Sequence, residues 1–240
     1  MKKAIVLLSG GMDSAVAFYI ARRTYQCHVL VFDYGQKAKG EIDYALKLSE
    51  MAGCENRVLK ISLPWKGSSL LDENKAIPDG KNAACGEIPD TYVPARNIIF
   101  LSYAVSFAEA INAEAVFIGA HQLDFSNYPD CRSEFFNSMR KAILWGTKKG
   151  SEGDPVEIIT PIIDMTKKEI VELGVKLGVP FEHTWSCYKS GERPCLECES
   201  CMFRQKAFEE LGIQDPLLSK MDTMLRETKD ERRGTEPVCR

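Results

Sequence analysis

Short, mostly apolar runs alternate along the chain with segments whose apolar residues recur at helical spacing. The apolar runs cover residues 4–8, 29–32, 57–61, 114–118 and 156–160. Continuous runs of this length are typical of parallel strands that helices cover on both faces. Helical spacing is found at residues 15–23, 41–51, 96–111, 132–146, 167–177 and 202–211. The order of these segments predicts an α/β fold, a doubly wound parallel five-stranded sheet.

Two stretches interrupt this alternation. Residues 62–94 are rich in proline and glycine, and a loop of that length is often a lid or a binding loop. Residues 183–201 form a cysteine-rich loop, and the last two dozen residues are charged without a clear period. We therefore expect an α/β domain at 1–180, a cysteine-rich region with a C-terminal helix at 181–216, and a charged tail at 217–240.

Composition and charge exclude several classes of protein. The chain has 240 residues, 45% of them hydrophobic and 27% charged, as in an ordinary globular protein. Its net charge of −3 argues against a broad nucleic-acid-binding surface, though not against a local basic cleft. The chain has no apolar run of the roughly 20 residues that a membrane helix needs, and the apolar start at 4–8 is too short for a signal peptide. We expect a cytoplasmic protein with reduced thiols, whose clustered cysteines bind a metal or act in catalysis.

A glycine-rich turn follows the first predicted strand and opens the first helix. Its sequence is SGGMDS, Ser9 to Ser14. Small residues let the backbone approach an anion, and the amides and positive dipole end of a helix N-terminus favour phosphate there. Asp13 is unusual beside a phosphate, unless it holds a bridging metal ion or caps the helix. The turn matches neither the G-x-x-x-x-G-K-[ST] nor the G-x-G-x-x-G pattern, and a plain capped turn is the alternative interpretation.

Four of the nine cysteines lie within fifteen residues of one another. Seven residues separate the first two, and two residues separate each later pair: Cys187, Cys195, Cys198 and Cys201. Four thiolates that converge on one ion form a closed structural zinc site. A C-x2-C-x2-C run also occurs in iron–sulfur proteins, which leaves that cluster as an alternative. The nearby His183 is a further candidate ligand.

Three further segments carry candidate binding residues. Arg96 and Asn97, in YVPARN, lie where a helix begins and where an anion or a polar ligand edge can bind. The loop after the fourth strand, 119–132, is rich in acidic, hydroxyl and aromatic groups, and ligands bind beyond the carboxyl ends of parallel strands. Lys167 opens a helix against its dipole, which indicates a nearby anion or else only a solvated face.

The SGGMDS turn resembles the phosphate loop of the PP-loop ATP pyrophosphatases, which share the adenine nucleotide alpha hydrolase-like fold. The resemblance implies that ATP is cleaved to AMP and pyrophosphate while a substrate oxygen is adenylated. It also implies that one continuous segment binds the nucleotide: Leu8, Ser9, Gly10, Gly11, Met12, Asp13, Ser14, Ala15, Val16, Ala17 and Phe18. Within it, the serines and glycines would hold pyrophosphate and Asp13 would hold Mg²⁺.

Taken together, the motifs resemble one PP-loop family, the 7-cyano-7-deazaguanine synthases of queuosine biosynthesis. The match covers residues 3–211 and rests on SGGMDS, YVPARN, DFSNYPDCR, TKKEI, TWSCY and the four cysteines. It implies a C–N bond-forming ligase that converts 7-carboxy-7-deazaguanine, ammonia and ATP to the nitrile. The expected cofactors are ATP, Mg²⁺ and Zn²⁺, and the expected assembly is a homodimer without nucleic acid or membrane partners.

The resemblance also suggests roles for polar residues outside the phosphate loop. Arg96 and Lys167 would neutralise phosphate or the substrate carboxylate. Asp124 or Asp130 would accept hydrogen bonds from the deazaguanine, and Arg132 would pair with its carboxylate. Either Phe125 or Tyr128 would stack on the ring.

Two other interpretations remain open from the sequence. Another PP-loop enzyme, tRNA-modifying or amide-forming, would adenylate its substrate in the same way. Against these, the chain leaves little room for an RNA-binding module and has no obvious glutaminase half, so free ammonia is the expected nitrogen source. A non-catalytic protein that binds zinc and a nucleotide is the alternative from a different class.

Overall fold

Five parallel strands form the centre of the molecule. The computed structural model describes residues 1–80, 87–123 and 128–223. The strands are β1 (Lys3–Leu7), β2 (Gln26–Asp33), β3 (Glu55–Lys60), β4 (Ala115–Ile118) and β5 (Glu157–Ile159). They pair in the order β3-β2-β1-β4-β5, every pair parallel. The doubly wound five-stranded sheet predicted from the sequence is confirmed.

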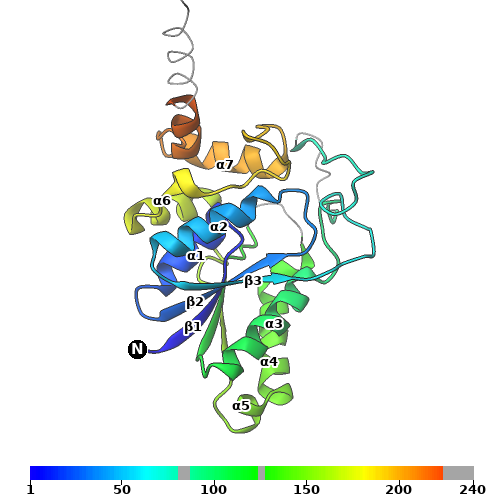
Figure 1. The fold of residues 1–240 in the computed structure, drawn as a ribbon, viewed down its shortest axis with the longest axis vertical. Helices are drawn as coiled ribbons and strands as arrows, with labels where there is room; N and C mark the ends of the chain where they lie inside the picture. The colour runs from blue at the N-terminus through cyan, green and yellow to red at the C-terminus, as the bar shows by residue number, and fades with distance from the viewer. Residues whose placement is uncertain (81–86, 124–127, 224–240) are drawn as a thin grey trace, which may run out of the picture.

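Helices cover both faces of the sheet (Figure 1). Those on one side are α1 (Met12–Ala21), α2 (Gly40–Met51) and α6 (Lys167–Leu177), with α7 (Glu199–Glu210) packed on α6. Those on the other side are α3 (Arg96–Ala110) and α4 (Ser133–Gly146), which α5 (Lys148–Ser151) follows. Short 3-10 turns, η2 (Pro129–Cys131) and η3 (Phe181–His183), complete the order. In the part of the chain that the structure describes, no helix is long and apolar enough to span a bilayer.

Alternate residues of the central strands β1, β2 and β4 serve two separate cores. Ala4, Val6 and Leu8 face the core beneath α1, whereas Ile5 and Leu7 face the core beneath α3. Both sets are buried, because a parallel sheet with helices on each side leaves neither face to water. The mostly apolar runs in the sequence therefore correctly predicted a parallel sheet covered by helices on both faces.

Element boundaries differ from the predicted ones at two functional places. Helix α1 begins at Met12, three residues before the predicted start, because Gly11 is already its N-cap. Helix α7 begins at Glu199, inside the predicted cysteine loop, because Cys198 is its N-cap. Residues 216–223 are also helical, and Leu217 packs with the cysteines.

Candidate nucleotide-binding site and cysteine centre

The turn between β1 and α1 lies tightly against α2. Gly10 has a φ of +84°, and a side chain there would place its Cβ 2.1 Å from the carbonyl oxygen of Glu41. A residue other than glycine is excluded by both conformation and space. Gly119, directly after β4, is equally close-packed, since a Cβ there would lie 2.7 Å from Ser14 Cα. These two glycines let the start of α1 sit between α2 and β4, facing the carboxyl ends of the strands.

Two serines shape the turn from inside. The hydroxyl oxygens of Ser9 and Ser14 are 3.0 Å apart, and the backbone amide of Gly11 donates to Ser9 Oγ at 3.3 Å. Ser14 Oγ donates to the Gly11 carbonyl at 3.0 Å. The first amides of a helix have no partner within the helix. The turn is therefore preshaped, with amides available to an anion at the N-terminus of α1.

Asp13 carries the main charge contact of this site. Its Oδ2 lies 2.5 Å from Lys167 Nζ, at the start of α6, and 3.6 Å from His121 Nε2, after β4. Burial would raise the pKa of Asp13, but the attraction of Lys167 and His121 outweighs it and holds the pKa below its usual value. The other oxygen, Oδ1, is buried and has no hydrogen-bond donor among the described residues. An ionised carboxylate with one oxygen to spare fits a Mg²⁺ ion that takes its remaining ligands from phosphates and water.

A cavity of about 270 Å³ opens beside the turn. Its lining includes Ser9, Gly11 and Asp13 on one side and Arg96 and Lys167 on others. Phosphate-loop, cationic and helix-start residues that lie far apart in the sequence therefore line one cavity. The size is near the lower end of that found for small-molecule sites.

Arg96 and Asp130 both lie at the start of α3 and have different partners there. Arg96 Nη1 donates to Tyr34 Oη at 3.3 Å. The Asp130 carboxylate accepts from the backbone amide of Asn97 at 3.2 Å, and the Asn97 side chain returns a bond to the Asp130 carbonyl at 2.9 Å. Asp130 is thus buried as a partner of the first turn of α3, and it is not among the residues that line the cavity.

Other predicted site residues lie in different surroundings. Arg132 is exposed at the N-cap of α4 and does not line the cavity, so its assignment to a substrate carboxylate gains no support. Tyr128 does line it, with its hydroxyl 2.6 Å from that of Thr91. Ala15, Val16, Ala17 and Phe18 are buried in the core beneath the turn. Asp124 and Phe125 lie outside the described residues.

The sequence analysis missed several cavity residues. Tyr34, Gln36 and Glu41 follow β2, and Trp185 and Tyr188 lie on either side of Cys187 in the sequence. The rule that ligands bind beyond the carboxyl ends of parallel strands applies to β2 as it does to β1 and β4. That rule was the available signal for the first three.

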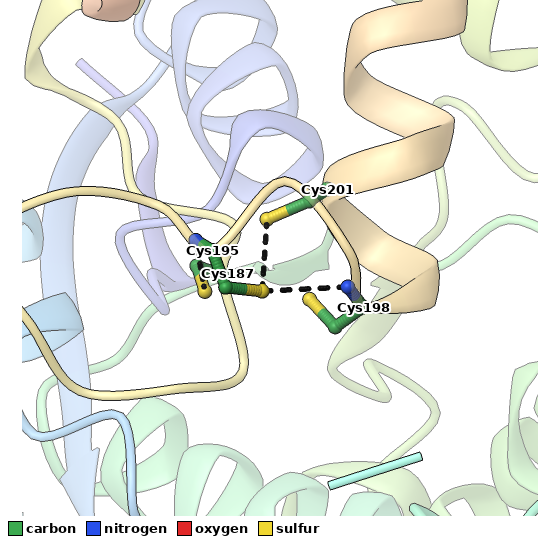
Figure 2. A group of neighbouring side chains, drawn as sticks. All are labelled: Cys187, Cys195, Cys198 and Cys201. Atoms are coloured by element: carbon green, nitrogen blue, oxygen red, sulfur yellow. Dashed lines mark hydrogen bonds between the residues drawn. The ribbon is translucent and has the colours of Figure 1, made fainter. Parts of the chain in front are cut away.

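The four predicted cysteines converge in one centre (Figure 2). Their sulfur atoms all lie within 4.8 Å of one another, and Cys195 Sγ is 4.0 Å from Cys201 Sγ. A tetrahedral zinc ion with bonds of about 2.3 Å needs sulfur atoms about 3.8 Å apart, so the donor set fits a metal. Backbone amides also point at the sulfurs, from Lys189 and Cys195 to Cys187 and from Cys198 to Cys195. Hydrogen bonds from the Cys198 and Cys201 thiols hold the pKa of Cys187 well below its usual value.

A buried ion pair holds this centre in place. Arg204 on α7 binds both carboxylate oxygens of Asp215, at 2.6 and 2.8 Å. The same guanidinium donates to Thr184 Oγ1 at 2.7 Å and to the Phe181 carbonyl at 3.0 Å. Trp185, which follows Thr184 in the sequence, donates its backbone N–H to the Gly10 carbonyl at 2.8 Å. The cysteine region is thereby connected to the phosphate loop.

The fold and the site define the class. The first strand of the parallel sheet leads through the SGGMDS loop into a helix, and cationic residues line the cavity beside that loop. This arrangement is typical of nucleotide-binding α/β proteins of the PP-loop type. Comparison with known proteins then identifies the family. The chain belongs to the family described as queuosine biosynthesis protein QueC, whose model matches residues 3–212.

Individual relatives agree with that assignment. The chain is 47% identical over 221 residues to 7-cyano-7-deazaguanine synthase from Thermosynechococcus vestitus, covering 90% of this chain and 95% of that protein. It is 45% identical to the protein of the same name from Trichodesmium erythraeum, covering 90% and 100%. NMN synthetase from Francisella tularensis is similar in structure, with a TM-score of 0.46 and 16% identity over 100% of this chain and 89% of that one. At that level the structural likeness adds nothing to the family assignment, which rests on the sequences.

Proposed function

We propose that this chain converts 7-carboxy-7-deazaguanine, ammonia and ATP to 7-cyano-7-deazaguanine, in queuosine biosynthesis. Family membership over residues 3–212 carries the proposal. A carboxylate is a poor electrophile, because its leaving group would be oxide. Adenylation supplies AMP as the leaving group, and ammonia then forms the amide. Adenylation of the amide oxygen by a second ATP permits loss of AMP and formation of the nitrile.

The site supports a division of roles for this chemistry. Ser9, Gly10, Gly11 and Ser14 would hold the pyrophosphate, with Asp13 as a ligand of Mg²⁺. This ion would supply charge neutralisation on the phosphates when bound. Arg96 and Lys167 would bind phosphate or carboxylate oxygens from two sides of the cavity, which fixes the reacting groups in position. We leave Asp124, Asp130 and Arg132 out of this proposal, and their substrate contacts remain predictions.

No protein nucleophile is needed, and the cavity agrees with that. Cys131 lines it, but burial raises the pKa of its thiol to about 12. A thiol with that pKa stays protonated at neutral pH and is a weak nucleophile. The attacking groups would instead be ammonia and the oxygens of the substrate.

The remaining parts have supporting roles. The four cysteine thiolates would hold Zn²⁺ as a structural ion within 181–216, beside the ATP-binding domain of 1–180. The predicted charged tail of 217–240 begins in a helix whose Leu217 packs with the cysteines. A cluster that depends on reduced thiols favours a cytoplasmic protein. We also propose that the protein is a homodimer and takes free ammonia as its nitrogen source.

One assay tests the function directly. The purified protein is given ATP, Mg²⁺, ammonium and 7-carboxy-7-deazaguanine, and AMP, pyrophosphate and the mass of the product are measured. We expect AMP release that depends on the acid, and a product lighter than the acid. Reactions without ammonium, or with glutamine in its place, are the controls. Binding of ATP without AMP release would favour a non-catalytic nucleotide-binding protein.

A further inference from the structure

Glu41 lies beside the phosphate loop, and the proposed division of roles does not include it. It belongs to the first turn of α2, and its carbonyl oxygen is the atom against which Gly10 packs. Its side chain lines the same cavity as Asp13, Arg96 and Lys167. Glu41 therefore brings a carboxyl group close to the place where the phosphates and the reacting carbon are expected.

The orientation of this carboxyl group is fixed by a buried amide. Gln36 Nε2 donates to Glu41 Oε1 at 3.0 Å and to the Phe32 carbonyl at 3.0 Å. Gln36 Oε1 accepts from the backbone amide of Tyr34 at 2.9 Å, and Gln36 is only 3% exposed. The backbone at the end of β2 thus holds Gln36, which in turn holds one oxygen of Glu41. Among the described residues, that amide is the one hydrogen-bond donor to the carboxylate.

The proposed reaction requires a proton acceptor near the nitrogen. When ammonia attacks the acyl adenylate, a C–N bond forms, the C–O bond to AMP breaks and the nitrogen loses one proton. When the amide oxygen attacks the second ATP, pyrophosphate leaves and the nitrogen loses another proton. Loss of AMP then breaks the C–O bond, and the electron pair of the last N–H bond completes the nitrile. The nitrogen therefore gives up three protons, and no oxidant or reductant is involved.

Four other ionisable groups of the cavity are poorly suited to accept those protons. One of them, His121, is directed at the Asp13 carboxylate, with its Nε2 3.6 Å from Oδ2. Asp13 is bound to Lys167, so an ammonium group neutralises its carboxylate. Cys131 stays protonated at neutral pH. Glu199 directly follows Cys198, a proposed metal ligand, at the start of α7. Among the described residues, the Glu41 carboxylate accepts a hydrogen bond only from the neutral amide of Gln36.

We propose that Glu41 is the general base that accepts the protons of the nitrogen as ammonia becomes the amide and then the nitrile. The inference rests on the proposed function and deepens it. Each proton would pass from the nitrogen to the carboxylate of Glu41 and then to solvent, which returns the residue to its ionised form. Gln36 would be the positioning residue for this group.

The electrostatic surroundings agree with this role. Burial raises the pKa of Glu41 to about 7, and the hydrogen bond from Gln36 and the charge of Arg96 limit the rise. The titratable and charged groups that face it are Tyr34, from the loop after β2, and Arg96, from α3. From the phosphate loop, Gly10 packs against the backbone carbonyl of Glu41. A general base is most effective when its pKa lies near the working pH.

The test compares Glu41→Gln with the wild type and with Glu50→Gln, an exposed position on the same helix. Glutamine keeps the shape and still accepts the hydrogen bond from Gln36, but it cannot take a proton. Three rates are measured: ATP–pyrophosphate exchange with the carboxylic acid and no ammonia, nitrile formation from the acid, and nitrile formation from the amide. The rate of nitrile formation is also followed from pH 6 to 9 at constant free ammonia.

For Glu41→Gln we expect exchange close to the wild-type rate, because the first adenylation removes no proton from nitrogen. Both nitrile-forming rates should fall by roughly 100-fold or more. The loss of rate below about pH 7 in the wild type should disappear, since it reports protonation of the base. Glu50→Gln should match the wild type.

Two results would overturn the inference. One is a Glu41→Gln protein that forms nitrile at the wild-type rate. The other is an equal loss in exchange and in nitrile formation, which would give Glu41 only a part in holding the phosphate loop. If the wild type itself exchanges pyrophosphate with the acid but forms no nitrile, the proposed function fails, and the role of Glu41 fails with it.

Discussion

The phosphate loop and the cysteine centre are adjacent parts of one molecule that prepare their binding sites in opposite ways. The loop offers backbone amides and small residues to a cavity, and its shape depends on close packing at Gly10 and Gly119. The cysteine centre offers four side chains that converge on one point, and a buried Arg204–Asp215 pair holds its surroundings. One backbone hydrogen bond, from Trp185 to Gly10, joins them. The first arrangement suits a substrate that enters and leaves, whereas the second suits an ion that stays.

Removal of one thiolate should have the largest effect and should separate the two regions. In Cys198→Ser we expect loss of one equivalent of bound metal, because a closed site needs all four ligands. A structural zinc ion supplies on the order of 10 kcal/mol to folding, so the C-terminal region should unfold well before the α/β core. Elemental analysis and thermal unfolding measure both effects. Cys54→Ser, outside the centre, is the matched control. A metal-free wild-type protein with full activity would contradict the assignment.

Breaking the buried ion pair should test how far the cysteine centre depends on it. Arg204→Gln leaves Asp215 buried without its cation, which costs about 3–5 kcal/mol. Chemical denaturation measures the loss. Arg204→Met combined with Asp215→Leu removes both charges and should recover part of it. The recovery should be incomplete, because Asp215 Oδ1 also accepts the backbone N–H of Leu217. An Arg204→Gln protein of wild-type stability would show that the pair contributes nothing.

Substitution of the charge at the phosphate loop should affect rate far more than folding. In Asp13→Asn the proposed ligand of Mg²⁺ is lost, and we expect turnover to fall by roughly 10²–10³-fold, about 3–4 kcal/mol. Pyrophosphate release measures the rate, and thermal unfolding should show a much smaller change. Asp43→Asn, exposed on α2, is the control. Undiminished turnover in Asp13→Asn would show that the metal assignment is wrong.

Most of the fold and the two motif-bearing sites followed from local sequence patterns. Apolar strands, helical spacing and the glycine turn each depend on neighbouring residues, so the sheet and the position of α1 could be predicted. The spacing of the four cysteines likewise indicated one centre, which the structure contains. These are cases in which the sequence itself places the interacting groups close together.

The residues that were missed are paired through loops that follow a strand or a helix and carry no periodic pattern. Arg204 has the spacing of an ordinary helix cation, yet it is 4% exposed, and its partner Asp215 lies beyond the end of α7. In the sequence, Gln36 resembles a turn residue and Glu41 a helix start. The hydrogen bond between their side chains depends on the conformation of the chain after β2. A pairing of two side chains through a loop leaves no periodic signal. Gln36 and Glu41 belong to no motif that the sequence analysis used, and only their place after β2 pointed to them.

The smallest expected effect concerns the helix that presents Lys167 to Asp13. Thr166 caps α6 by accepting the amide of Glu169 at 3.3 Å, while the Glu169 carboxylate accepts the amide of Thr166 at 2.8 Å. In Thr166→Ala we expect a loss of about 1 kcal/mol, which is a fall in Tm of about 2–4 °C for a chain of this size. The KM for ATP should rise slightly more than in Ser138→Ala, a control on the exposed face of α4, because the start of α6 holds a cation of the cavity. An unchanged KM with the same fall in Tm would mean that the Asp13–Lys167 contact orients α6 without its cap. The cysteine centre should keep its full metal content in either case, since the Thr166 cap adjoins the Lys167–Asp13 contact at the phosphate loop and includes no cysteine.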